Sequence, residues 1–139
     1  MSAAIDGRSD VKETIMTSIL IVEDNKLLRE MLKDIFESNG FKVRVALDGQ
    51  DGIDSYRKEP AGLVITDVIM PGKDGLAMIR DLKKEFPDVK IIVISGADAD
   101  VPDRLQVARE LGAIRALRKP FAPDALLDAV NEVLAGSPF

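Results

Sequence analysis

Three acidic residues and a lysine each follow a short aliphatic run, and together their types could handle a phosphoryl group. Glu23 and Asp24 follow the first run, Asp67 follows a later one, and Lys119 follows the last. A carboxylate can attack phosphorus directly to give an acyl phosphate, and a lysine can neutralise the charge on the transferred group. Ser95, after a fourth run, could donate its hydroxyl hydrogen to a phosphoryl oxygen. These residues indicate phosphoryl transfer to a carboxylate.

If the three acids converge, their mutual repulsion needs an offset. Two carboxylates about 5 Å apart repel by about 3 kcal/mol at an effective dielectric constant of about 20, so three pairs give roughly 10 kcal/mol. That sum rivals the whole stability of a typical domain, about 5–15 kcal/mol. Lys119 can neutralise one charge, and oxygen ligands that leave room for water suit Mg²⁺. We therefore expect a Mg²⁺ site that is completed when a phosphoryl group arrives.

Asp67 is the candidate nucleophile among these acids. It comes one residue after the run at 63–66, and Met70 and Pro71 soon follow it, where a strand cannot continue. Asp74, three residues after Pro71, is interpreted as the cap of the next helix rather than as a ligand. The site would need neither histidine nor cysteine.

Composition excludes several other classes of site. The 139 residues contain no histidine and no cysteine, which excludes imidazole bases, His-ligated metals, disulfides and thiolate chemistry. The formal net charge is 19 − 24 = −5, which argues against a nucleic-acid partner. No signal peptide and no membrane-spanning apolar run is recognisable, so we expect no membrane partner and a cytoplasmic location.

The remaining pattern predicts an α/β domain. Short aliphatic runs alternate with segments of helical spacing, and parallel strands joined by helices place helices on both faces of one sheet. The run at 41–45 alternates polar and apolar residues, which is typical of an edge strand. We therefore predict a doubly wound, five-stranded parallel sheet with strands at 19–22, 41–45, 63–66, 90–94 and 113–117, and five helices at about 26–38, 50–58, 74–86, 102–111 and 124–134.

Three segments are expected along the chain. Residues 1–17 are predicted to be an N-terminal extension, flexible or a short helix, residues 18–136 the folded domain, and residues 137–139 a tail. Because the last helix would run almost to the end of the sequence, no output domain is expected within it.

The spaced residues closely resemble the receiver domain of two-component response regulators. The matching pieces are IVEDN at 21–25, DVIMPGKDG at 67–75, SGA at 95–97 and KPF at 119–121. The resemblance implies a flavodoxin-like sheet with strand order 2-1-3-4-5. It also implies that Asp67 is the phospho-acceptor, that Ser95 and Lys119 contact the phosphoryl group, and that Mg²⁺ is held by Glu23, Asp24, Asp67 and the Ile69 carbonyl.

The same resemblance implies the partners. A histidine kinase or a histidine phosphotransfer protein would supply the phosphoryl group, and an unidentified downstream protein or a second copy of the chain would respond to it. The chain would then be a signalling phosphoacceptor that catalyses only its own phosphorylation and dephosphorylation, not an enzyme on other substrates.

One residue departs from the family pattern. Receivers of this type usually carry Tyr or Phe three residues before the lysine, and here that position is Ala116. The usual aromatic readout is therefore excluded, although Ala116 takes no part in the chemistry. Ile69 and Ala97 flank the site without polar side chains, so we expect self-dephosphorylation without side-chain assistance.

Simpler interpretations stand beside these. Glu23 and Asp24 could form a solvated turn that caps the next helix. Leu27, Met31 and Ile35 are interpreted as core and helix surface rather than as a docking site. The alternative function is a pseudo-receiver, a constitutive binding module that is never phosphorylated. A Mg²⁺-dependent phosphohydrolase is disfavoured, because Ile69 stands where a second carboxylate would act as general acid.

Overall fold

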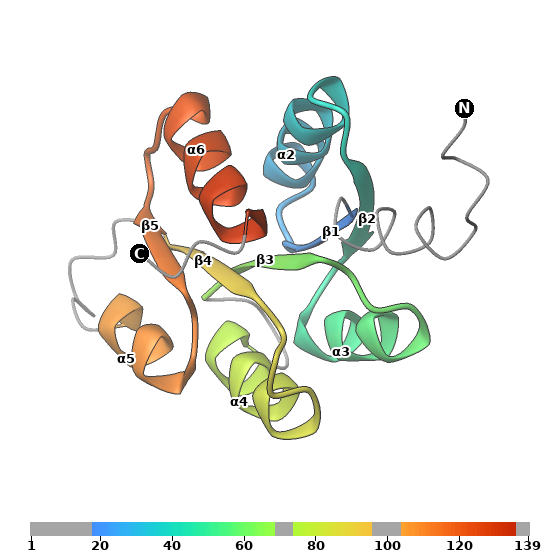
Figure 1. Cartoon of the computed structure of the whole chain (residues 1–139), viewed down its shortest axis with the longest axis vertical. Coiled ribbons are helices and arrows are strands. Elements are labelled where there is room, and N and C mark those ends of the chain that lie inside the picture. The colour runs from blue at the N-terminus through green and yellow to red at the C-terminus, as the bar shows by residue number, and fades with distance from the viewer. Residues whose placement is uncertain (1–17, 69–73, 96–103, 136–139) are drawn as a thin grey trace.

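The computed structural model describes residues 18–68, 74–95 and 104–135 (Figure 1). They form a five-stranded, wholly parallel sheet in the order β2-β1-β3-β4-β5. This confirms the predicted sheet and its strand order. The strands are β1 (Ser18–Val22), β2 (Lys42–Ala46), β3 (Leu63–Asp67), β4 (Ile91–Ser95) and β5 (Arg115–Arg118).

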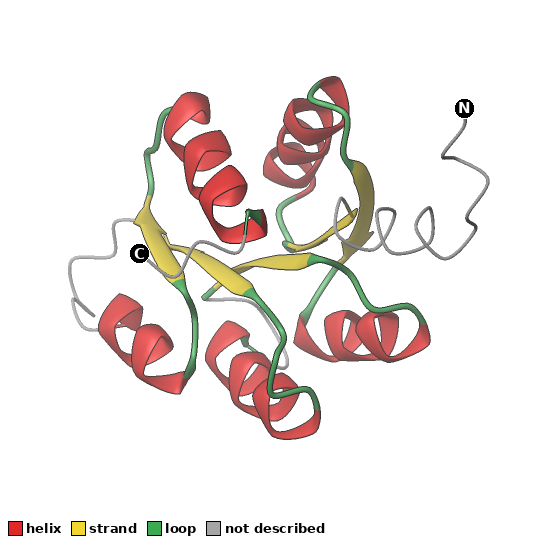
Figure 2. Cartoon of the chain, viewed as in Figure 1, coloured by secondary structure: helices red, strands yellow, loops and turns green. Residues whose placement is uncertain are grey.

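Helices cover both faces of this sheet. Helices α2 and α6 lie on one face, and α3, α4 and α5 lie on the other (Figures 1 and 2). This is the doubly wound arrangement predicted from the alternating pattern. The helices are α2 (Lys26–Ser38), α3 (Gly49–Lys58), α4 (Gly75–Glu85), α5 (Arg104–Leu111) and α6 (Pro123–Leu134).

The strand sequences explain which strands lie inside. The three inner strands are aliphatic on both sides and are buried nearly throughout, because each face of the sheet is covered by helices. Alternate side chains enter two separate apolar clusters, with Leu20 and Val64 among those on the α3–α5 side and Ile21 and Ile65 on the α2–α6 side. The partly exposed β2 lies at one edge, as its alternating pattern predicts.

The helix cap predicted among the acidic residues is present in the structure. Asp74 caps α4, accepting a hydrogen bond from the Ala77 backbone N–H at 2.9 Å, as predicted. The simpler interpretation of Glu23 and Asp24 as a solvated turn that caps the next helix is wrong, because Glu23 is buried and Asn25 Oδ1 accepts from the Leu28 N–H at 2.9 Å.

The predicted start of the last strand is also wrong by two residues. Ala113 donates its N–H to the Ala108 carbonyl, so it belongs to the turn that follows α5. Strand β5 therefore begins at Arg115 rather than at residue 113. Over such a short apolar stretch, hydrophobic periodicity does not distinguish a helix from a strand. The sequence therefore misplaces the boundary between the loop and β5.

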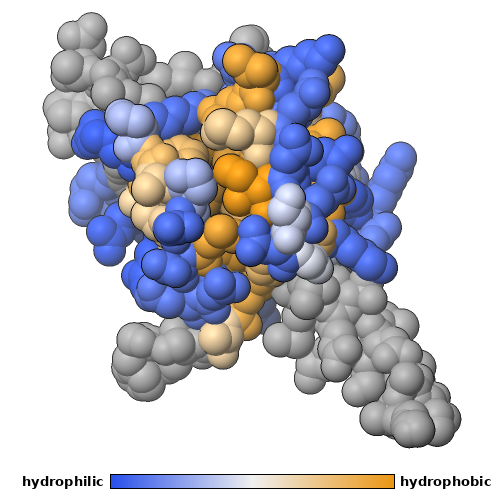
Figure 3. All heavy atoms as spheres, turned by 90° about the horizontal axis from the view of Figure 1, so that it is seen from above, coloured by the Kyte–Doolittle hydropathy of each residue, from blue (hydrophilic) through white to orange (hydrophobic). Residues whose placement is uncertain are grey.

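Helix α2 does not bury all of its apolar residues. Leu27 is 82% exposed and Met31 is 45% exposed, so neither is a core residue, while Leu32 and Phe36 are fully buried. Figure 3, viewed from the side of α2 and α6, shows apolar side chains gathered in a band with hydrophilic ones around it. Within the described part of the chain, no helix is long and apolar enough to span a bilayer.

Candidate functional site

The site residues lie where four neighbouring strands end. Asp67 is the last residue of β3 and Ser95 the last of β4, while Glu23 directly follows β1 and Lys119 directly follows β5. Because all strands are parallel, their carboxyl ends share one edge of the sheet, where open α/β sheets bind ligands. The topology therefore brings together residues that are up to 96 positions apart, from 23 to 119.

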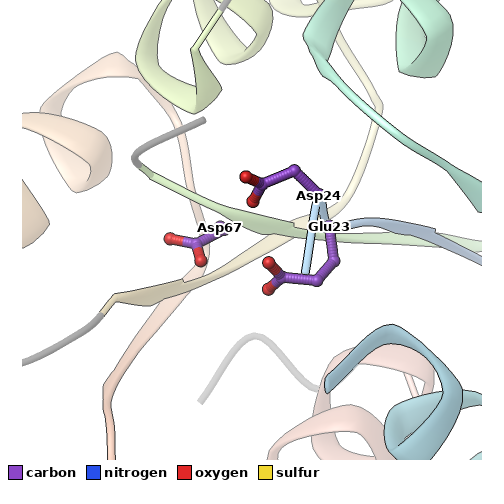
Figure 4. A group of neighbouring side chains, drawn as sticks. All are labelled: Glu23, Asp24 and Asp67. Atoms are coloured by element: carbon purple, nitrogen blue, oxygen red, sulfur yellow. The ribbon is translucent and has the colours of Figure 1, made fainter. Parts of the chain in front are cut away.

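Three carboxylates form a compact cluster at this edge. One oxygen each from Glu23, Asp24 and Asp67 lies within 4.8 Å of the other two. Figure 4 shows the three carboxyl groups projecting to the same side, beyond the ends of β1 and β3. Glu23 and Asp67 are buried, whereas Asp24 is exposed. A ligand approaching from solvent would meet Asp24 first.

Among the residues that the structure describes, Lys119 is the cation that faces the cluster. Its Nζ donates to Asp67 Oδ2 at 2.8 Å and lies 3.6 Å from Glu23 Oε1. The backbone N–H of Lys119 also donates to the Ser95 carbonyl at 2.7 Å, which fixes the start of the loop that carries the lysine. One lysine therefore neutralises one of three negative charges, as the sequence suggested.

The buried Glu23 carboxyl shows how much charge remains uncompensated. Its Oε2 accepts the Asn25 N–H at 3.1 Å, but its buried Oε1 accepts no hydrogen bond from the described residues. Burial, together with repulsion from Asp67, raises the pKa of Glu23 from 4.5 to about 7, against the opposing effects of the Asn25 N–H and Lys119. An unsatisfied oxygen and two nearby carboxylates fit a divalent cation with oxygen ligands, such as Mg²⁺.

This raised pKa predicts a pH dependence of stability without metal. The folded state binds the Glu23 proton more tightly than the unfolded state. The resulting contribution to the unfolding free energy is therefore complete below pH 4.5 and is lost as the pH rises through about 7. In EDTA, we expect the unfolding free energy of the wild type, relative to Glu23→Gln, to fall by up to roughly 3 kcal/mol between about pH 5 and about pH 8. Urea unfolding of both proteins measures this difference, and parallel pH profiles would contradict it.

The turn between β1 and α2 is tied together by residues that the sequence did not single out. Asn25 donates to Glu23 Oε2 and also caps α2 through its own side chain. Arg29 Nη1 donates to the Glu23 carbonyl at 2.9 Å and lies 3.3 Å from the Asp24 carbonyl. The only signal in the sequence is an arginine one helical turn after Asn25, which normally indicates a solvated helix surface.

Gly75 supports the Asp67 side of the site. A Cβ at position 75 would lie 2.0 Å from the Asp67 carbonyl oxygen and 2.9 Å from the Val68 Cα. The Gly75 N–H donates to the Val68 carbonyl at 2.9 Å, so the start of α4 is held directly against the end of β3. Only glycine allows this close approach of the two backbones.

The structure thus brings Glu23, Asp24, Asp67 and Lys119 together as predicted and places Ser95 at the end of the adjoining strand. The Ile69 carbonyl, Gly96 and Ala97 lie outside the described residues. Residues 1–17 and 137–139, predicted as extension and tail, lie outside them too.

Comparison with known proteins decides the family. The profile of the response regulator receiver domain matches residues 19–131. The chain belongs to this family. This receiver is 35% identical to the chemotaxis protein CheY of Bacillus subtilis over 119 residues, covering 84% of this chain and 96% of CheY. It is 33% identical to sporulation initiation phosphotransferase F of the same organism, covering 84% and 92% of the two chains.

Other relatives carry the receiver within a longer chain. A C4-dicarboxylate transport transcriptional regulatory protein, DctD of Pseudomonas aeruginosa, is 36% identical over 85% of this chain, but the match spans only 25% of DctD. Among solved structures, a receiver domain protein from Clostridium thermocellum superposes with a TM-score of 0.81 at 27% identity, covering 86% of this receiver and 95% of that chain. The receiver domain of NtrX from Brucella abortus gives 0.80 at 28% identity, covering 86% and 99%.

Proposed function

We propose that this receiver takes a phosphoryl group on Asp67 and thereby changes its interactions with other proteins. The observation that carries the proposal is the Lys119 ammonium, 2.8 Å from Asp67 Oδ2, inside a cluster of three carboxylates. The donor would be a histidine kinase or a histidine phosphotransfer protein, and the responding partner a downstream protein. The receiver would act as a cytoplasmic signalling phosphoacceptor rather than as an enzyme on other substrates.

The transfer needs one bond to form and one to break. A carboxylate oxygen of Asp67 forms a bond to phosphorus while the phosphorus–nitrogen bond of the donor phosphohistidine breaks, and the electron pair leaves with the imidazole. Lys119 moves from pairing with the carboxylate to neutralising the phosphoryl oxygens, and the Ser95 hydroxyl donates a hydrogen bond to one of them.

Glu23, Asp24, Asp67 and the Ile69 carbonyl would hold Mg²⁺. When bound, Mg²⁺ supplies positive charge both to the acidic cluster and to the oxygens of the transferred group. Two observations support this assignment. Glu23 Oε1 accepts no hydrogen bond from the described residues, and the exposed Asp24 carboxylate is accessible to an incoming hydrated ion.

Intact mass after incubation with acetyl phosphate tests this function. With Mg²⁺ we expect a gain of one phosphoryl group, lost again on treatment with hydroxylamine, which cleaves acyl phosphates. With EDTA in place of Mg²⁺ we expect the rate of phosphorylation to fall by at least about a hundredfold, because the repulsion between the acidic cluster and the phosphoryl donor is then uncompensated.

One observation favours a second candidate function. Ala116, a half-buried residue of β5, replaces the aromatic side chain by which receivers of this type usually read out phosphorylation. A pseudo-receiver that binds its partner constitutively would not need that side chain. A wild-type protein that gains no phosphoryl group in the presence of Mg²⁺ would favour this function over the first.

A further inference from the structure

A single residue of α2 binds the carbonyl groups of three consecutive residues in the turn that follows β1. The backbone N–H of Arg29 donates to the Asn25 carbonyl at 2.9 Å. Its side-chain Nη1 turns back along the helix, 2.9 Å from the Glu23 carbonyl and 3.3 Å from the Asp24 carbonyl. Arg29 therefore connects the helix to each residue of this turn.

These contacts fall where the sheet no longer holds the chain. The paired register of β1 ends at Val22, and the last ladder-like bond beyond it runs from the Glu23 N–H to the Ala46 carbonyl. The Glu23 and Asp24 carbonyls come after that point. The guanidinium supplies the donor that a neighbouring strand would otherwise provide.

The position of the two carbonyls matters for Asp24. The Glu23 carbonyl belongs to the peptide plane before the Asp24 Cα, and the Asp24 carbonyl belongs to the plane after it. Since peptide units are planar, restraining the carbonyl oxygens of both planes restrains φ and ψ of Asp24 and hence the direction of its Cα–Cβ bond. Arg29 Nη1 contacts both carbonyl oxygens, so one donor atom restrains both planes.

Asp24 has more need of such support than the other two acids. Glu23 and Asp67 are buried, with exposures of 1% and 7%, so the surrounding core limits where their carboxylates can point. Asp24 is exposed, and packing gives its side chain little restraint. Its backbone must therefore be held from outside the core.

We propose that Arg29 is a positioning residue for Mg²⁺: by restraining the two peptide planes around Asp24, it holds the Asp24 carboxylate where the ion binds. The inference rests on the proposed function, because it requires the acidic cluster to bind Mg²⁺. It adds a residue that touches neither the ion nor the phosphoryl group.

The sign of the effect separates positioning from charge. Removing a cation beside a Mg²⁺ site would, by electrostatics alone, strengthen Mg²⁺ binding. Loss of positioning weakens it, and groups that orient metal ligands are typically worth about 10- to 100-fold in affinity. Weaker binding after removal of Arg29 is therefore opposite to the charge effect.

The test compares Mg²⁺ dissociation constants measured by amide NMR titration of Arg29→Met, Arg29→Lys and the wild type. We expect Arg29→Met to raise the constant about tenfold. Arg29→Lys keeps the charge but loses the planar fork of donors, so we expect a rise of about threefold. At saturating Mg²⁺, the rate of phosphorylation by acetyl phosphate should stay within about twofold of the wild type, because the acid is then held by the ion.

Arg44→Met is the matched control. Arg44 Nη2 also donates to a backbone carbonyl, that of Glu59, but it does so in the middle of β2 and at the end of α3, away from the acidic cluster. We expect its Mg²⁺ dissociation constant to equal that of the wild type, even if urea unfolding shows lower stability.

Equal Mg²⁺ affinity in the wild type and in both Arg29 variants would overturn the inference while leaving the proposed function intact. An equal loss of affinity in the Arg44→Met control would also overturn it, because a general loss of stability would then explain the result. A wild type that binds no Mg²⁺ would refute the proposed function itself, and the role of Arg29 with it.

Discussion

Asp67→Asn is expected to lower the rate of phosphorylation by acetyl phosphate by at least about a hundredfold, so that no gain of a phosphoryl group is detected. An amide is a poor nucleophile toward phosphorus, and the substitution also removes one of the three charges that would attract Mg²⁺. The amide oxygen can still accept the hydrogen bond from Lys119 Nζ, so the site should keep its shape. Intact mass spectrometry after a fixed incubation measures the effect.

The control is the same change at an acid outside the site. Asp54 is exposed on α3, where it accepts a hydrogen bond from Gln50 and pairs with Arg57. Asp54→Asn should gain a phosphoryl group as the wild type does. A full gain in Asp67→Asn would show that another residue is the acceptor and would remove the basis of the proposed function.

The second large effect is expected on folding. Gly75→Ala would place a methyl group 2.0 Å from the Asp67 carbonyl oxygen, and this neighbour is backbone, which cannot rotate away. The carbonyl also accepts a hydrogen bond from the buried Thr66 hydroxyl at 2.8 Å, which further restrains its position. We expect the unfolding free energy to fall by about 3 kcal/mol or more, measured by urea denaturation.

Gly40→Ala gives the comparison for this prediction. Gly40 has a φ of +88°, but a Cβ there would meet nothing within 4 Å. Only the left-handed backbone conformation opposes the substitution, at a cost of about 1–2 kcal/mol. A smaller loss in Gly75→Ala than in Gly40→Ala would mean that the start of α4 can move away from β3, contrary to the close contact described above.

The fold was predictable because its signals repeat along the chain. Five aliphatic runs separated by helical spacing leave few alternatives to a parallel sheet, and the parallel sheet then brings the strand ends to one edge. The convergence of Asp67 and Lys119 follows from that topology and needs no knowledge of side-chain detail. For the same reason, the acidic pair at 23–24 could be placed beside them.

The supporting residues could not be predicted in this way. Which polar side chain caps a helix depends on one residue of register, so Asn25 rather than Asp24 takes that position. Whether an arginine points into solvent or folds back onto the backbone, as Arg29 does, depends on the path of the preceding turn. The close contact at Gly75 likewise appears only when two elements are packed together.

Asn25 contacts both the acidic cluster and α2, so a change at the cluster could be transmitted to the helix. Its N–H holds the Glu23 carboxylate, and its side-chain oxygen holds the first turn of α2. A carboxylate that rotates to meet an ion must pull on this N–H or release it, and the same residue then carries the disturbance into the helix. The exposed Leu27 lies within that first turn. A movement of the buried Glu23 carboxylate could therefore shift an apolar side chain on the surface of the molecule.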